Sequence, residues 1–364
     1  MDETIALNAH ETTQPCAAAL ERQIDSSLIP HRLQMISHLV GAGEEDRFVF
    51  TSSAAEAVNQ VLWSLFLEVS RKTGKCHYIT TALEDAPTMQ MLKRLEDLGC
   101  YVKIAPVNAQ GQVDLQQLEA LISPKTALIS MTMAHGLTGV VQPVEEIAAM
   151  AKSKGVLLHL DGAYAVGKYA FSFADLGADY LTFCGNLIHG VPGTGGLFAK
   201  PEAPLVPFIL GGKGLRGGPT DTASFLSLCS AAHQSALFLD PMSLEIARLR
   251  DLFESELTGR IPGAKPLFQE TLRLPNTSLI AFPQVHGEAL HYLLQKKVKA
   301  SIGGNYAQHL SRLLEASHIA DNECAVSFAL SRMTTEQEIG QAVQEITRAV
   351  KTLQFISRGV FDAV

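Results

Sequence analysis

Residues Ala178 to Lys200 read ADYLTFCGNLIHGVPGTGGLFAK. The apolar run from Tyr180 to Phe183 predicts a buried strand, and the glycine-rich loop after it leads into a second apolar strand. Two buried strands joined by a short loop are typical of the central sheet of an α/β protein. The loop between them contains no lysine.

The chain before this stretch alternates between β-rich and helical patterns, which predicts crossover connections and a mostly parallel sheet. The predicted strands are 48–51, 76–80, 126–133 and 156–160, and the predicted helices are 53–69, 87–98, 114–122 and 143–154. Ser53 and Glu56 form a capping-box pattern at the first of these helices. A ligand in such a sheet lies beyond the carboxyl ends of the strands. The loops expected to form a site are those at Ser52, Asp85, His135, Asp161 and Cys184.

The pattern changes past about residue 235, where longer helices alternate with short strands. The predicted helices are 242–258, 287–296, 306–315 and 335–357, and the predicted strands are 278–282 and 325–330. This arrangement indicates a smaller α+β domain.

Composition excludes several classes of protein. The 364 residues carry a net charge of −8, which argues against a nucleic-acid partner. No stretch approaches the roughly 18 unbroken apolar residues of a membrane span. The acidic N-terminus lacks the pattern of a signal peptide. Six scattered cysteines show no metal-ligand spacing, so we expect a cytoplasmic protein with reduced thiols and no metal site.

The quoted stretch resembles the cofactor-lysine segment of the cysteine desulfurases, the class V aminotransferase branch of the fold-type I pyridoxal phosphate (PLP) enzymes. Their version is roughly Ser-x-His-Lys-x-x-Gly-Pro-x-Gly-x-Gly-x-Leu, and the match continues through Gly190, Gly193, Gly195 and Leu197. Further segments resemble the family at residues 7–15, 50–59, 139–143, 161–168, 211–218 and 332–339.

The resemblance implies a fold and an assembly. The expected fold is α/β and fold-type I PLP transferase-like, with a mainly parallel seven-stranded sheet and a smaller C-terminal α+β domain. The expected large domain is 15–235, and the small one combines 1–14 with 236–364. Because members of the family are homodimers, we expect a dimer.

Three positions that carry catalysis in the family differ in this sequence. Leu187 stands at the lysine that holds PLP as a Schiff base, and leucine has no amine. Tyr306 stands at the cysteine that accepts sulfur. Ser327 stands at the arginine that grips the substrate carboxylate, which removes a charge-assisted contact. We therefore predict that no residue of the chain is catalytic for desulfuration.

The positions that bind the cofactor in the family are altered as well. Asp161, which pairs with the pyridine nitrogen, is kept, and the helix start at Ser53 remains, although Ala54 and Ala55 occupy the phosphate cradle. Lys213 is the lysine considered as a substitute amine, whereas Lys168 is expected to stay solvated. The other altered positions are Asp85 (stacking histidine), Tyr164 (glutamine), His135 or Gly136 (asparagine), Cys184 and Asn186 (serine and histidine that bind phosphate), and Pro219 (threonine across the dimer).

These losses predict a catalytically degenerate desulfurase homologue that takes no cofactor. Its expected role is a scaffold or regulator in sulfur or iron–sulfur metabolism, paired with a true cysteine desulfurase or another sulfur-transfer protein. Two alternatives stay open. One is an enzyme, either a PLP-dependent desulfurase or lyase that uses Lys213, or a new activity in the old cleft. The other is a small-molecule sensor with His135, Tyr164 and Asp85 as polar contacts.

Overall fold

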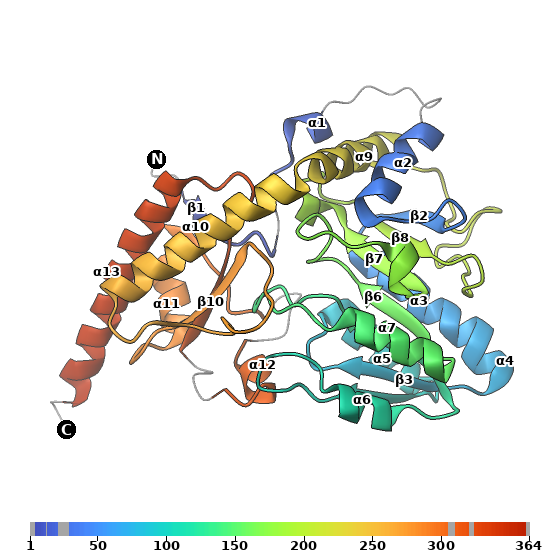
Figure 1. Cartoon of the computed structure of the whole chain (residues 1–364), viewed down its shortest axis with the longest axis horizontal. Helices are drawn as coiled ribbons and strands as arrows, with labels where there is room; N and C mark the ends of the chain where they lie inside the picture. The colour runs from blue at the N-terminus through green and yellow to red at the C-terminus, as the bar shows by residue number, and fades with distance from the viewer. Residues whose placement is uncertain (1–3, 12, 21–28, 305–309, 320–323, 362–364) are drawn as a thin grey trace.

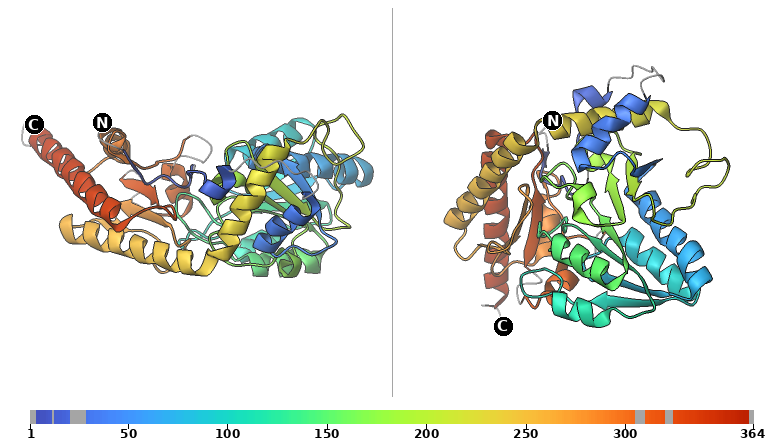
Figure 2. Two further views of the ribbon diagram at one scale, coloured as in Figure 1. Left: turned by 90° about the horizontal axis from the view of Figure 1, so that it is seen from above. Right: turned by 45° about the vertical axis from the view of Figure 1, so that its right-hand side comes forward.

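The computed structural model describes residues 4–11, 13–20, 29–304, 310–319 and 324–361. A larger α/β part and a smaller part lie side by side, and the long helix α10 (Leu239–Arg260) runs from one to the other (Figure 1). Seen from above, the molecule is elongated, and both termini lie at the end formed by the smaller part (Figure 2).

A seven-stranded sheet built from the described residues forms the centre of the larger part, in the order β2-β8-β7-β6-β5-β3-β4. Strand β8 is antiparallel to both of its neighbours, and the other pairs are parallel. The strands are β2 (Arg47–Thr51), β3 (His77–Thr81), β4 (Tyr101–Ala105), β5 (Thr126–Thr132), β6 (Leu157–Asp161), β7 (Tyr180–Cys184) and β8 (Gly195–Ala199). The predicted α/β architecture with a mainly parallel sheet is therefore confirmed.

Helices cover both faces of this sheet, and each face has its own apolar core. The first core packs against α3 (Ala54–Leu65), the π-helical turn η2 (Phe66–Ser70) and α5 (Ala86–Asp97), while the exposed α4 (Arg71–Thr73) continues from η2. The second packs against α2 (Ile29–Val40), α6 (Leu115–Leu121), α7 (Val144–Lys154), α8 (Phe173–Leu176) and α9 (Thr222–Leu237). The short α1 (Ala17–Leu20) lies against α9.

The smaller part has a core of its own, which joins Leu7 to side chains between Leu249 and Val350. Its strands are β9 (Lys265–Pro266), β10 (Thr277–Ala281) and β12 (Ala325–Ala329), which are antiparallel, and β1 (Ile5–Ala6) with β11 (Val298–Lys299), which are parallel. Its remaining helices are α11 (Gly287–Leu294), α12 (Leu310–Ala316) and α13 (Glu336–Phe361). The domain boundaries given above stay a prediction.

Local chemistry explains the start of α3, the helix that begins at the end of β2. Ser53 is its N-cap, and the Ser53 hydroxyl accepts a hydrogen bond from the Glu56 amide (3.2 Å), as the capping-box pattern predicts. Glycine is needed opposite this turn, because a Cβ on Gly195 of β8 would lie 2.6 Å from the Ser53 carbonyl carbon. The glycines of the quoted stretch thus bring β8 against the start of α3.

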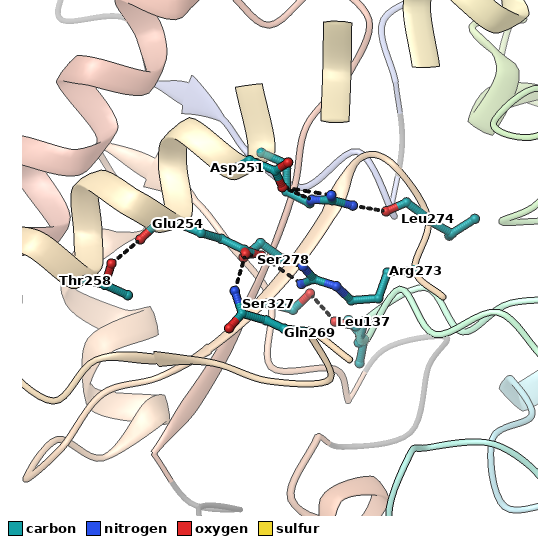
Figure 3. Close-up of polar contacts among 10 residues, drawn as sticks. Leu137, Asp251, Glu254, Thr258, Gln269, Arg273, Leu274, Ser278 and Ser327 are labelled. Carbon is teal, nitrogen blue, oxygen red and sulfur yellow. Dashed lines mark hydrogen bonds and ion pairs between the residues drawn. The ribbon is translucent and has the colours of Figure 1, made fainter. Parts of the chain in front are cut away.

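The loop after β5 fastens the larger part to the smaller one. The Leu274 amide donates to the Gly139 carbonyl (2.7 Å), and the Val141 amide donates to the Leu272 carbonyl (2.9 Å). These two backbone hydrogen bonds form the seam between the larger and the smaller part. Beside this seam, Glu254 of α10 forms a buried ion pair with Arg273 (Figure 3). The seam holds Leu137, in the same loop, at the edge of a cavity.

Candidate functional site

A cavity of about 340 Å³ opens beyond the carboxyl ends of the central strands. The ends of β6 and β7 and the starts of α3 and α5 line it from the larger part. Ser301 and Gly303 line it from the smaller part, and His10 and Glu11 from the N-terminal segment. This is the position in which an open α/β sheet holds its ligand.

Leu187 lies on the wall of this cavity. It belongs to the 3₁₀ turn η3 (Gly185–Ile188) directly after β7, and its side chain is 7% exposed. The sequence resemblance predicts the family's lysine at this position, and the structure places a buried isobutyl group here. Among the described residues that line the cavity, no side chain carries an amine or a guanidinium.

Asp161, at the end of β6, is the polar group at the base of the cavity. One carboxylate oxygen accepts a hydrogen bond from the Ala163 amide (3.0 Å), and Thr182 also bonds to the carboxyl group. Burial, with a smaller effect from the nearby Asp85, raises the pKa of Asp161 to about 7.

Asp85 and Tyr164 form a pair across the cavity. The Tyr164 hydroxyl donates to the Asp85 carboxylate (2.7 Å), so these two predicted site residues bind each other. Burial raises the pKa of Asp85 to about 6. Glu84 lies next to Asp85, accepts bonds from the Thr81 hydroxyl and the Thr132 amide, and is 1% exposed.

Glu84 gives the site a measurable pH signature. Burial raises the pKa of Glu84 to about 8 from its ordinary 4.5, so the folded protein keeps a proton that the unfolded chain loses. This contribution to stability is complete below about pH 4.5 and is lost as the pH rises through about 8. We expect the free energy of unfolding to decline between about pH 6.5 and 8, by up to about 1.4 kcal/mol per pH unit for each such group. Glu84→Gln should flatten this decline.

The measurement is denaturant unfolding across that pH range. Burial lowers the pKa of His10, His135 and His159 to about 3, so these histidines affect only the acid side of the profile. The exposed Glu119→Gln is the charge-matched control. If the free energy of unfolding of the Glu84→Gln protein falls with pH as steeply as that of the parent, the pH dependence does not come from Glu84.

His10 is a site residue that the sequence analysis missed. It lines the cavity and is 6% exposed, and neither ring nitrogen has a hydrogen-bond partner among the residues that the structure describes. Its Nε2 lies 3.9 Å from a Glu11 carboxylate oxygen, which is beyond hydrogen-bond distance. A lone histidine in an N-terminal segment carries no spacing signal that could have revealed it.

The amino end of α3 lines the part of the cavity that favours an anion. Side chains of the protein already occupy much of this part. The Glu56 carboxylate accepts from the Ser52 amide (2.8 Å) and from Arg216 (2.6 Å). Although burial opposes this effect, these bonds keep the pKa of Glu56 below its ordinary value. The Ala54 amide bonds to the Cys184 sulfur, which also contacts the Asn186 side chain.

Of the two positions that the resemblance assigns to substrate handling, the structure describes only Ser327. Ser327 of β12 is fully buried, and its hydroxyl donates to the Leu137 carbonyl (2.7 Å), so it does not line the cavity (Figure 3). Tyr306 lies outside the described residues.

Two residues proposed as site groups lie elsewhere. His135 is 1% exposed and does not line the cavity, because its Nδ1 accepts the Thr138 amide within its own loop. Lys213 lies in an exposed segment and is not part of the cavity wall.

The expectation that the Lys168 amine is solvated is wrong. Lys168 is half-buried, and its amine donates to the Leu187 carbonyl (3.3 Å), while burial lowers the pKa of Lys168 to about 8. The turn that contains Leu187 therefore binds this amine through its backbone.

Two kinds of site are not found in the described part of the chain. No group of three or more metal-ligating side chains occurs there. None of its helices has the length and hydropathy needed to cross a membrane.

The sheet order, the smaller part and the cleft at the strand ends are those of a fold-type I transferase-like protein. The chain belongs to the aminotransferase class V family, whose family model matches residues 27–341. It is 33% identical to cysteine desulfurase 2 of Trichormus variabilis, over 88% of this chain and 82% of that one. It is 30% identical to the cysteine desulfurase NifS of Azotobacter vinelandii, over 89% and 82%. A NifS-like protein of solved structure superposes with a TM-score of 0.87, at 24% identity, over 96% and 100% of the two chains.

Family membership corrects one prediction. The expectation that the protein takes no cofactor is wrong, because class V aminotransferases and the cysteine desulfurases it resembles depend on PLP. The expectation gave too much weight to the missing lysine, which supplies the covalent bond but not all of the binding energy.

The cavity residues fit this cofactor in part. Asp161 is placed to hold the pyridine nitrogen, and the amino end of α3 favours a phosphate. The aldehyde end does not fit, because Leu187 offers no amine. When bound, PLP would supply an electron sink.

Proposed function

We propose that this protein is a class V aminotransferase-family member that does not release sulfur from cysteine, and that its cleft holds a pyridoxal-type cofactor non-covalently. The observation that carries the proposal is Leu187, a buried leucine on the cavity wall, which the sequence resemblance aligns with the family's lysine. Without that amine, the cofactor cannot form a Schiff base with this position of the protein or pass from it to a substrate by transimination.

The closed substrate side supports the same proposal. The resemblance assigns position 327 to the arginine that binds the substrate carboxylate, whereas here the Ser327 hydroxyl donates to the Leu137 carbonyl within the protein. Without a charge-assisted bond from an arginine to the substrate carboxylate, substrate binding is weakened. Without a lysine to form a Schiff base with the cofactor, the covalent step of catalysis is lost as well.

The role that we propose is that of a scaffold or regulator in sulfur or iron–sulfur metabolism, acting as a homodimer or paired with a sulfur-transfer protein. Exposed apolar side chains at the junction of α9 and α10 support an interface, namely Leu237, Phe238 and Leu244. The choice of partner rests on the likeness to cysteine desulfurases and is an analogy.

A sulfide assay tests the proposal directly. The purified protein, supplied with PLP, cysteine and a reducing thiol, is expected to release no sulfide above the protein-free background. An active cysteine desulfurase assayed in parallel serves as the positive control. Catalytic turnover by the protein would overturn the proposal.

The enzyme alternative needs a non-standard lysine, and borohydride reduction of the protein with PLP identifies any such residue by peptide mass. Lys213 and Lys168 are the sites to inspect. Stoichiometric modification of either would support the enzyme instead.

A further inference from the structure

We propose that Ser130, His159 and Thr182 are positioning residues, which form a hydrogen-bonded chain that ends on Asp161 and keeps its carboxylate charged and oriented. The chain lies within the central sheet, and none of the three residues is among those that line the cavity. The inference deepens the proposed function and rests on it, because the ligand that Asp161 meets is the pyridoxal-type cofactor of that proposal.

The first observation is the register of three neighbouring strands. In β5, β6 and β7, Ser130 pairs with His159, and Asp161 pairs with Thr182. Paired residues of adjacent strands project from the same face of a sheet, and so do residues two apart in one strand. The four side chains therefore lie on one face, in a row that ends at the carboxyl ends of the strands.

The second observation is a continuous series of contacts along this row. The Ser130 hydroxyl lies 2.8 Å from Nδ1 of His159, and Nε2 of His159 lies 3.0 Å from the Thr182 hydroxyl. Thr182 in turn bonds to the Asp161 carboxyl group. Ser130, His159 and Thr182 are at most 1% exposed, so water does not compete for these bonds.

The direction of the chain follows from the chemistry of its members. Burial lowers the pKa of His159 to about 3, so the ring is neutral and has one donor and one acceptor nitrogen. A charged Asp161 only accepts, so Thr182 donates its proton to the carboxylate and accepts from Nε2. Nδ1 is then left to accept from Ser130. Reversing the chain would require a proton on Asp161.

The direction decides what Asp161 can bind. Burial and the nearby Asp85 raise the pKa of Asp161 to about 7, and the bonds from the Ala163 amide and Thr182 oppose that rise. A carboxylate that these donors hold charged accepts a charge-assisted hydrogen bond from a protonated ring nitrogen, whereas a neutral carboxyl group does not. Thr182 and His159 therefore act on the ligand through Asp161.

Nitrogen NMR of the histidine-labelled full chain, without ligand, tests the direction. At a pH above the pKa of Asp161, His159 is expected to be the Nε2–H tautomer. Its signals are identified by their absence from the spectrum of a His159→Gln protein. The Nδ1–H tautomer would overturn the inference.

PLP and its deaza analogue, in which a C–H replaces the ring nitrogen, form a matched pair of probes for the ligand. Titration calorimetry is expected to show that Thr182→Val weakens PLP binding by about 10-fold, the contribution of a hydrogen bond to a charged group, and changes the binding of the analogue by less than about 2-fold. Thr182→Ser keeps the hydroxyl and should restore the affinity for PLP. A merely structural role for Thr182 would affect both probes alike.

Thr80→Val is the matched control, because it makes the same change in β3, where the buried Thr80 hydroxyl has no hydrogen-bond partner in the described structure. It should leave the binding of both probes unchanged. Circular dichroism confirms that each variant is folded.

The outcomes separate this inference from the proposed function. An unchanged affinity for PLP in folded Thr182→Val, or an equal loss for both probes, overturns the inference and leaves the non-covalent binding of PLP intact. Binding of neither probe by the parent overturns non-covalent binding and the inference with it. Sulfide turnover in the parallel assay overturns the proposed function itself.

Discussion

Replacing Leu187 with lysine is expected to give a protein that binds PLP covalently at that residue, in contrast to the non-covalent binding that we propose for the parent. The side chain at 187 already lies on the cavity wall, and η3 fixes its backbone directly after β7. A lysine there presents its amine to a bound aldehyde at a high effective concentration. Borohydride reduction followed by intact mass measurement should show one added phosphopyridoxyl group per chain, against none in the parent.

Pro87→Lys is the matched control, because Pro87 also lines the cavity but lies at the start of α5, away from the family's lysine position. It should remain unmodified under the same conditions. Leu187→Lys is not expected to restore sulfide release, since Ser327 still bonds to Leu137 and offers no guanidinium to the substrate. Equal labelling of the parent chain, or none in the variant, would contradict the assignment of position 187.

The sequence predicted those features of the fold that depend on nearby residues. Ser53 and Glu56 lie three residues apart, and their capping contact forms as the pattern predicts. The positions of the buried strands β3, β5 and β6 also followed from local apolar runs. The loops at Ser52, Asp85, Asp161 and Cys184 converge on one cavity, as expected from the carboxyl ends of neighbouring strands.

The contacts that the sequence could not predict join distant segments. His10 reaches the cavity because Ile5 pairs with Val298 and the Ala9 amide bonds to the Ala329 carbonyl, both more than 290 residues away in the chain. His135 was expected in the cavity because it follows a strand, but its own loop folds over it. No periodicity or motif encodes either outcome.

Arg273→Met is expected to lower the free energy of unfolding by about 3–5 kcal/mol, the cost of leaving one partner of a buried ion pair alone. Both side chains of the Glu254–Arg273 pair are at most 7% exposed, and the closer nitrogen–oxygen distance is 2.7 Å (Figure 3). The Ser278 hydroxyl (2.8 Å) and the Gln269 amide (3.1 Å) also donate to Glu254. Denaturant unfolding measures the change.

The ion pair also matters to the cavity, because Arg273 bridges to Val140 in the loop that carries Leu137. Adding Glu254→Met to Arg273→Met should recover most of the lost stability, since it removes the unpaired charge. Arg248→Met breaks an exposed pair on the same helix, α10, and should cost far less. An Arg273→Met protein as stable as the parent would show that the buried Glu254 carboxylate does not need its ion pair with Arg273. The backbone hydrogen bonds alone would then hold the seam beside the cavity.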